Sequence, residues 1–164
     1  MNPLARFASR RRATFLGALT VLVGLAVPAM FGTLATADDL GLQGLRGERL
    51  SEADLAQGTT IFIVWASWSP HSRNIVDRVN PLVQRWSGKA RVVTVNFQEE
   101  RGAVDGFLSG KNLGAPVFLD ADGSFSKKYA VATLPGLLIV KDGRVAYRGR
   151  LPEDPDRVIV EILP

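Results

Sequence analysis

Three side chains that could carry out chemistry stand close together in the segment VWASWSPHSRNIV, residues 64–76. Ser69 and Ser72 supply hydroxyls, and His71 is the single histidine of the chain. A catalytic serine needs a histidine base, a third group that orients the base, and a site for the oxyanion. Side chains two residues apart at a helix start do not face each other, which argues against a Ser69–His71 pair. Since Ser followed by Pro is a favoured helix start, Ser69 is predicted to be a helix cap whose hydroxyl accepts a backbone N–H.

Composition limits the other chemistries of this segment. The chain has no cysteine, and its two methionines are Met1 and Met30. Thiol–disulfide exchange is therefore excluded, because it needs a thiolate. His71 has no cysteine or methionine to join it in a metal site, so no metal and no cofactor is predicted. His71 is expected to be an exposed residue of the first helical turn.

Residues 1–37 have the layout of a targeting segment. Four arginines at 6, 10, 11 and 12 precede an uncharged run over 13–37 that ends in ATA. This pattern predicts a secretory signal peptide that is cleaved after Ala37. The run is also long enough to span a bilayer, so an uncleaved inner-membrane anchor stays open as the alternative. SRRRATFL, residues 9–16, is similar to a twin-arginine export signal, and the export route stays open too.

Most of the positive charge belongs to that targeting segment. Without its four arginines, 16 of the 20 basic residues remain, against 16 acidic residues. Nucleic-acid binding needs a basic surface, and this balance does not favour it. The expected location is periplasmic or otherwise extracytoplasmic, with a membrane contact only through an uncleaved anchor. Residues 38–164 are long enough for one domain with a single core.

Strand and helix patterns alternate along residues 38–164. A hairpin is predicted over 42–50 and a short helical turn over 51–55. Apolar and β-branched runs predict strands over 59–66, 91–97, 116–120, 136–140 and 144–151, the last two joined by an Asp142–Gly143 turn. Helical spacing predicts helices over 70–87, 99–112, 124–131 and 153–163, with Pro81 inside the first. This order predicts an α/β domain with a mixed central sheet flanked by helices and an N-terminal hairpin extension.

Several of these segments resemble those of the exported TlpA/ResA-like thioredoxins. WASWSPHS, residues 65–72, resembles the WASWCPPC type of motif, and TLPG, residues 133–136, resembles the T-x-P loop before the third core strand. LIVKDGRVAYRGRL, residues 138–151, is similar to the hairpin of these proteins. The resemblance runs from residue 40 to about 163 and implies a thioredoxin-like fold of the redoxin, AhpC-TSA type. It further implies that Pro135 follows a cis peptide bond and faces the motif.

The departures from this family matter for function. Ser69 and Ser72 occupy the positions of the two redox cysteines, so the family's catalytic positions are degenerate and no catalytic residue is assigned. Ile63 stands where many relatives have a polar or acidic group that assists proton transfer. In strongly oxidising relatives a histidine like His71 stabilises the thiolate, and that role is void here. The resemblance therefore implies a family member without the family's chemistry.

The resulting hypothesis is a non-catalytic binding or assembly module for an extracytoplasmic protein or peptide. Its groove would consist of Trp68, Ser69, Pro70, His71, Ser72, Leu134 and Pro135. In the family, the backbone before the cis-proline pairs with an extended substrate, which needs no thiol. Trp65 is predicted to be core, whereas Trp68 is either a structural residue or a peptide anchor. Three alternatives stay open: a family role in cell redox homeostasis or cytochrome c maturation, glutathione binding through a serine, and a purely structural envelope subunit.

Overall fold

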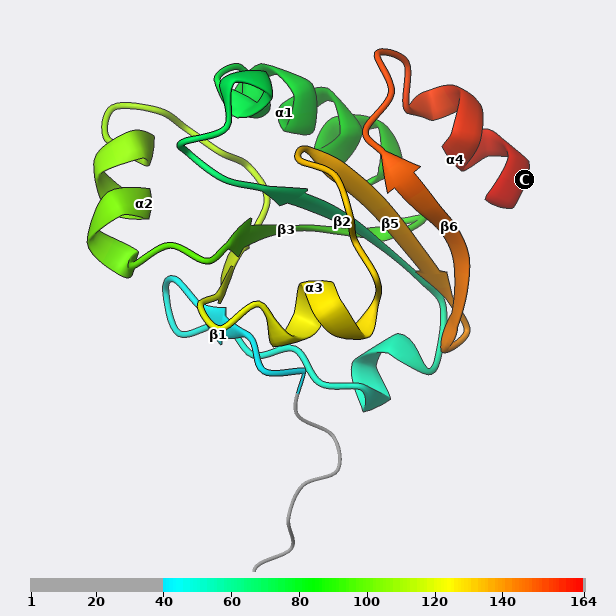
Figure 1. Ribbon diagram of the computed structural model, residues 1–164. Coiled ribbons are helices and arrows are strands. Elements are labelled where there is room, and N and C mark those ends of the chain that lie inside the picture. The colour runs from blue at the N-terminus through cyan, green and yellow to red at the C-terminus, as the bar shows by residue number, and fades with distance from the viewer. Residues whose placement is uncertain (1–39, 164) are drawn as a thin grey trace, which may run out of the picture. The chain divides into compact units, whose positions relative to one another are not determined.

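A six-stranded mixed sheet organises the part of the chain that the computed structural model describes, residues 40–163 (Figure 1). The strand order is β1-β4-β3-β2-β5-β6. The strands are β1 Gln43–Gly44, β2 Thr59–Trp65, β3 Arg91–Phe97, β4 Val117–Asp120, β5 Gly136–Lys141 and β6 Arg144–Arg150. The predicted α/β architecture with a mixed sheet is confirmed. The predicted signal peptide or anchor, residues 1–37, lies outside the described residues.

Strand β2 lies inside the sheet, between β3 and β5, and its sequence TTIFIVW contains no charged residue. All seven of its residues are buried. It pairs in parallel with β3 and antiparallel with β5. A strand covered on both faces has this uninterrupted apolar pattern rather than an alternating one.

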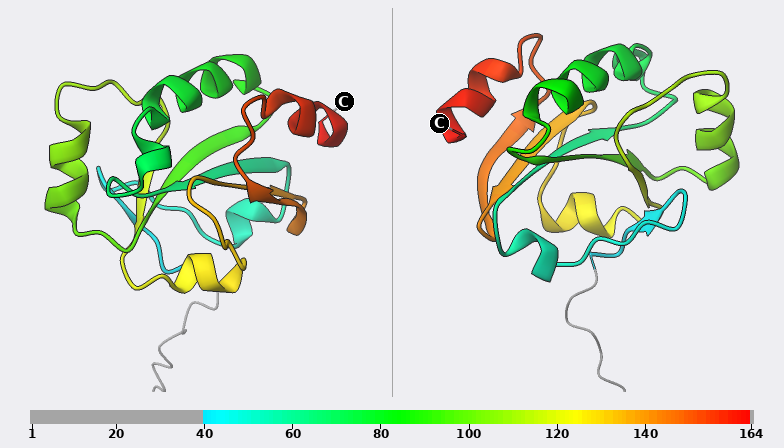
Figure 2. Two further views of the ribbon diagram at one scale, coloured as in Figure 1. Left: turned by 45° about the horizontal axis from the view of Figure 1, so that its top comes forward. Right: turned by 180° about the vertical axis from the view of Figure 1, so that it is seen from behind.

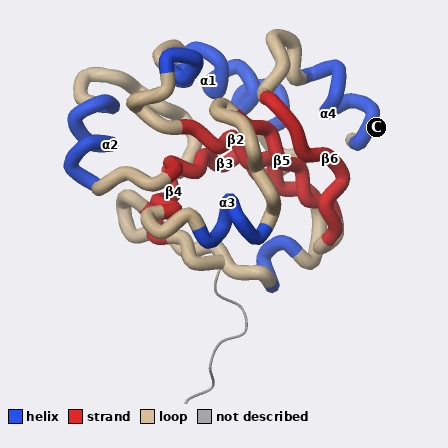
Figure 3. The backbone as a smooth tube through the Cα atoms, in the orientation of Figure 1, coloured by secondary structure: helices blue, strands red, loops and turns tan. Residues whose placement is uncertain are grey.

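Helices cover both faces of the sheet (Figures 1 and 2). The first face packs against α1 (Ile75–Trp86), α2 (Arg101–Leu108) and α4 (Asp156–Ile162) through the apolar core that holds Ile63, Trp65 and Leu137. The second face packs against α3 (Ser124–Lys128), the 3₁₀ helix η1 (Ala53–Leu55) and the preceding loop, as the tube in Figure 3 also shows. Among residues 40–163 no helix is both long and apolar enough to cross a bilayer.

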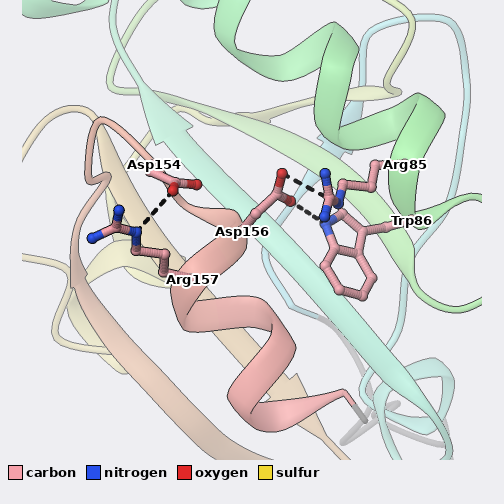
Figure 4. A network of polar contacts seen from close by, with 5 residues as sticks. All are labelled: Arg85, Trp86, Asp154, Asp156 and Arg157. Atoms are coloured by element: carbon pink, nitrogen blue, oxygen red, sulfur yellow. Dashed lines mark hydrogen bonds and ion pairs between the residues drawn. The ribbon is translucent and has the colours of Figure 1, made fainter.

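A polar network attaches α4 to the end of α1 (Figure 4). The indole Nε1 of Trp86 donates to Asp156 at 2.7 Å, and the Arg85 guanidinium lies 3.3 Å from the same carboxylate. Arg157 pairs with Asp154 at 3.0 Å in the turn before the helix. The C-terminal helix is therefore held over the sheet by specific contacts as well as by burial of Ile159.

Two predicted elements differ from the structure. The hairpin predicted over 42–50 is not formed, because β1 pairs antiparallel with β4 instead. The chain then folds back so tightly that a Cβ on Gly44 would lie 2.2 Å from the Glu48 carbonyl oxygen, while Leu42 and Leu50 stay buried on the second face. The helix predicted over 70–87 is also split, into a 3₁₀ turn η2, Pro70–Ser72, and α1, which begins at Ile75.

Candidate functional site

The candidate site lies at the end of the sheet where strands β2 and β3 finish and strand β5 begins. Strand β2 runs into the motif after Trp65, and β5 begins directly after Pro135. Their antiparallel register pairs Val64 with Gly136, which places Pro135 beside the start of the motif. The parallel strand β3 ends at the same edge, with Asn96 opposite Trp65.

Ser69 occupies the helix-cap position, but its hydroxyl makes no cap hydrogen bond. The turn is closed by the backbone instead, since the Ser72 N–H donates to the Ser69 carbonyl at 3.0 Å. The predicted position is thus confirmed and the predicted hydrogen bond is wrong. The physical reason is that a single 3₁₀ turn follows Ser69. In this turn the Ser72 N–H, which the Ser69 hydroxyl was expected to accept, already donates to the Ser69 carbonyl oxygen.

The hydroxyls of the motif do not form a nucleophilic arrangement with His71. Within residues 40–163 no hydrogen bond joins His71 to either serine, and the imidazole is exposed as expected. Ser72 is completely buried, and its Oγ has no hydrogen-bond partner. The same part of the chain also contains no group of three His, Cys, Asp or Glu side chains arranged to hold a metal ion.

A carboxylate that the sequence analysis missed holds the motif loop. Glu99 accepts hydrogen bonds from the Ser67 backbone N–H at 2.6 Å, from the Ser67 hydroxyl and from Asn96 Nδ2 at 2.7 Å. Both of its oxygens are therefore used to fix the loop that carries Trp68. Ile63, at the position of the family's acidic group, is buried in the first core. The signal for Glu99 was its place just after β3, because parallel strands end at a common edge.

An apolar recess of about 410 Å³ opens beside the motif. Trp68 stands at it with 61% of its side chain exposed, and Ser69, only 4% exposed, lies within its wall. Its lining is Trp68, Ser69, Phe97, Ser126, Val131, Ala132, Thr133 and Leu134. The buried Oγ of Ser126 has no partner in the described residues, so the recess also holds one unsatisfied polar atom.

Residues 131–134 of the loop before β5 line this recess, and Pro135 follows them. The Leu134–Pro135 peptide bond is cis, and Pro135 is buried. The loop packs so closely on β5 that a Cβ on Gly136 would lie 2.8 Å from the Thr133 carbonyl oxygen. Within residues 40–163, the N–H and C=O groups of Thr133 and Leu134 make no backbone hydrogen bond. They are free to pair with an added extended chain.

The remaining predicted groove residues fall on the other side of the motif. Pro70, His71 and Pro135 line a separate recess of about 640 Å³, together with residues of α1 and of the β6–α4 connection. Ser72 lines neither recess. The structure therefore divides six of the seven residues between two recesses, three in each, and buries Ser72 away from both.

Among residues 40–163, three groups have shifted pKa values, and none of them lines either recess. The backbone N–H and the hydroxyl of Ser51 lower the pKa of Asp54. The backbone N–H and then the hydroxyl of Ser124 do the same for Asp122. Burial raises the pKa of Tyr129 in α3's C-terminal turn.

Comparison with solved structures finds the same fold in several other proteins. A putative thiol:disulfide interchange protein DsbE from Chlorobium tepidum superimposes with a TM-score of 0.64 and 23% identity, over 74% of this chain and 88% of that one. StoA from Bacillus subtilis gives 0.61 and 23%, over 71% and 90%. A secreted disulfide oxidoreductase of Mycobacterium tuberculosis gives 0.60 and 20%, over 73% and 91%. At these identities the likeness shows the fold, and the predicted thioredoxin-like fold is confirmed.

Sequence comparison supplies the family. No curated protein sequence matches the chain. The model of the AhpC/TSA family matches residues 34–148, which covers the sheet up to the middle of β6. These residues include the motif, the loop before β5 and most of the hairpin that carried the resemblance. The chain belongs to the AhpC/TSA family.

Proposed function

We propose that this protein binds an extended polypeptide segment at the apolar recess and does not exchange disulfides. The occupant is a segment of an extracytoplasmic protein. One side chain of that segment fills the recess beside Trp68, and its backbone pairs with Thr133 and Leu134. The protein acts as a binding or assembly module that has the fold of its family but lacks the two redox cysteines.

The observation that carries this proposal is a largely exposed aromatic residue, Trp68, that lines an apolar recess. Trp68 is the most exposed of the large hydrophobic side chains in residues 40–163, at 61%. A side chain of this kind contributes strongly to binding when a partner covers it. The free peptide groups of Thr133 and Leu134 supply the second element, since β-augmentation needs unpaired N–H and C=O groups.

The family's thiol chemistry does not extend to this chain. Its structural neighbours include a thiol:disulfide interchange protein and a disulfide oxidoreductase, whose names describe those proteins. Disulfide exchange requires a thiolate on the attacking protein, and this chain has no cysteine. Ser69 and Ser72 are buried and stand in the cysteine positions, so their hydroxyls fill the space of the thiols only.

Export supports an extracytoplasmic partner. The basic start and the uncharged run over 13–37 have the layout of a signal peptide or anchor. We therefore place the domain outside the cytoplasm, either released or held by that segment. A protein in this location meets polypeptides that are still extended after crossing the membrane.

Peptide binding by the full-length chain tests the proposal. The probe is a pool of short fluorescein-labelled peptides of degenerate, uncharged sequence, and the readout is fluorescence anisotropy. We expect Trp68→Ala to weaken binding about thirtyfold, as truncation of a central aromatic anchor does. Val160→Ala is the matched control, because Val160 is also an exposed apolar side chain, at 47%, but lies on α4.

The outcomes separate the alternatives. Equal binding by the wild type and the Trp68→Ala variant would remove the recess as the binding site. No binding by any protein would favour a purely structural subunit. An insulin-reduction assay should give only the background rate, and turnover above it would contradict the non-catalytic assignment.

A further inference from the structure

The second recess at the motif has a strongly basic lining. It is formed by the 3₁₀ turn η2 and the start of α1 on one side and by the β6–α4 connection on the other (Figures 1 and 2). Three guanidinium groups, Arg73, Arg78 and Arg150, line it together with His71. We call this site the basic recess. Glu153 is the one carboxylate among the side chains that line it.

The arginines of the basic recess are not neutralised by the protein. Within residues 40–163, no carboxylate lies within ion-pair distance of Arg73, Arg78 or Arg150. Elsewhere the same domain does pair its charges, as Arg85 does with Asp156 and Arg157 with Asp154. The basic recess is therefore a local excess of positive charge in a chain whose charge is nearly balanced from residue 38 on.

Arg78 links helix α1 to the β6–α4 connection within the basic recess. Its Nη2 donates to the carbonyl oxygens of Leu151 at 3.1 Å and Pro152 at 2.7 Å, and its side chain is half-buried. A guanidinium has five N–H donors, so several remain for a ligand. Helix α1 begins at this point with Asn74 as its cap residue, and the positive end of its dipole adds to the potential. A guanidinium can bind a carboxylate through two parallel hydrogen bonds, and the carboxylate is the anionic group that polypeptide side chains carry.

The two recesses adjoin each other across the motif. Ser69 lines the apolar recess and Pro70 the basic recess, while Leu134 lines the first and Pro135 the second. A single extended chain lying over these residues would reach both. Side chains along a strand follow one another at about 3.3 Å per residue, so residues close in the ligand's sequence would occupy the two sites.

We infer that the partner segment is acidic, with Asp or Glu side chains in the basic recess next to the apolar side chain in the other recess. This inference rests on the proposed function and adds the chemistry of the ligand. The carboxylates would complete the hydrogen bonding of Arg73, Arg78 and Arg150. Such charge-assisted pairs select among ligands and speed association.

Three peptide pools test the inference with the full-length chain. Each pool has a central leucine, and its flanking positions are Glu, Gln or Lys. At low salt we expect the Glu pool to bind about tenfold more tightly than the Gln pool and the Lys pool to bind least. At high salt the difference should fall to about threefold or less, because screening acts on exposed charges.

The variant R73Q/R150Q should lose most of its preference for the Glu pool over the Gln pool, because only one of the three guanidinium groups remains. Arg78 is left in place, because it holds the β6–α4 connection. The matched control is R49Q/R144Q, which removes the same charge from two exposed arginines that do not line the recess. We expect this control to keep the preference for the Glu pool.

Each result decides between the two proposals. If the Glu and Gln pools bind equally well and their binding still depends on Trp68, the inference of an acidic ligand is refuted and the proposed function stands. Loss of the preference in both double variants would also refute that inference, since net charge alone would then explain the effect. If Trp68→Ala leaves the affinity for the Glu pool unchanged while the Glu pool still binds more tightly than the Gln pool, the basic recess is supported and the proposed groove is contradicted. Failure of all three pools to bind would overturn both.

Discussion

Replacing Glu99 by alanine tests how the motif loop is held in place. The carboxylate accepts three hydrogen bonds, two from Ser67 and one from Asn96. A hydrogen bond to a charged group contributes about 1.5–3 kcal/mol net. Ser67 and Glu99 are partly exposed, so water replaces part of what they lose, whereas Asn96 is completely buried and loses its partner outright. We therefore expect Glu99→Ala to lower the free energy of unfolding by about 2–4 kcal/mol.

Urea unfolding followed by tryptophan fluorescence measures this loss. Against a total stability of about 5–15 kcal/mol for a domain, the change is large. The corresponding fall in Tm is on the order of 10 °C. Glu100→Ala is the control, since this neighbouring carboxylate is exposed and makes no cap hydrogen bond in α2. If the two variants unfold at the same urea concentration, the hydrogen bonds of Glu99 do not hold the loop and the argument fails.

Three further predictions concern single positions. Ser72→Ala should raise stability by about 1 kcal/mol in urea unfolding, because it removes a buried hydroxyl without a partner; a loss of stability would show that the hydroxyl is satisfied. Gly136→Ala should cost about 1–3 kcal/mol in the same assay, since the new Cβ would meet the Thr133 carbonyl oxygen; unchanged stability would contradict the close packing of the loop. Hydrogen bonds from Ser51 lower the pKa of Asp54 below its ordinary value of 3.8. The ionised Asp54 therefore stabilises the fold above pH 3.8, and this stabilisation is lost as the pH falls through the lowered pKa. Asp54→Asn should therefore flatten the acid side of a stability–pH profile, and a profile unchanged from the wild type would refute this.

Strands β2 and β5 were predictable because they are buried on both faces of the sheet. TTIFIVW and GLLIVK have no plausible place outside a sheet core, and the predicted strands agree with β2 and β5 to within one residue. The loop geometry was less predictable. Pro70 permits either a 3₁₀ turn or the first turn of an α-helix, and the sequence does not say where the i→i+4 pattern begins. The hairpin over 42–50 failed because pairing depends on which sheet edge is free, and the free edge was that of β4.

The sequence allowed us to predict which residues stand at the site, but not which side chains interact there. The positions of Trp68, His71 and Leu134 followed from the order of motifs. The role of Glu99 did not, because it depends on a contact between residues 67 and 99 that only the register of β2 and β3 creates. The arginines of the basic recess were also missed. Arg73 and Arg78 lie close together in the sequence, but Arg150 is more than seventy residues away and joins them only because the end of β6 lies beside the start of α1.

Strand β6 ends the sheet, and its sequence affects how separate molecules meet. It pairs only with β5 in the described sheet, so its outer edge presents free backbone groups that another strand could use. Arg144, Arg148 and Arg150 are spaced along this strand. Two copies approaching edge to edge would bring these charges into opposition, which disfavours continuation of the sheet from one molecule into the next. Arg150, which lines the basic recess, thus also helps to keep separate molecules from pairing through their sheets.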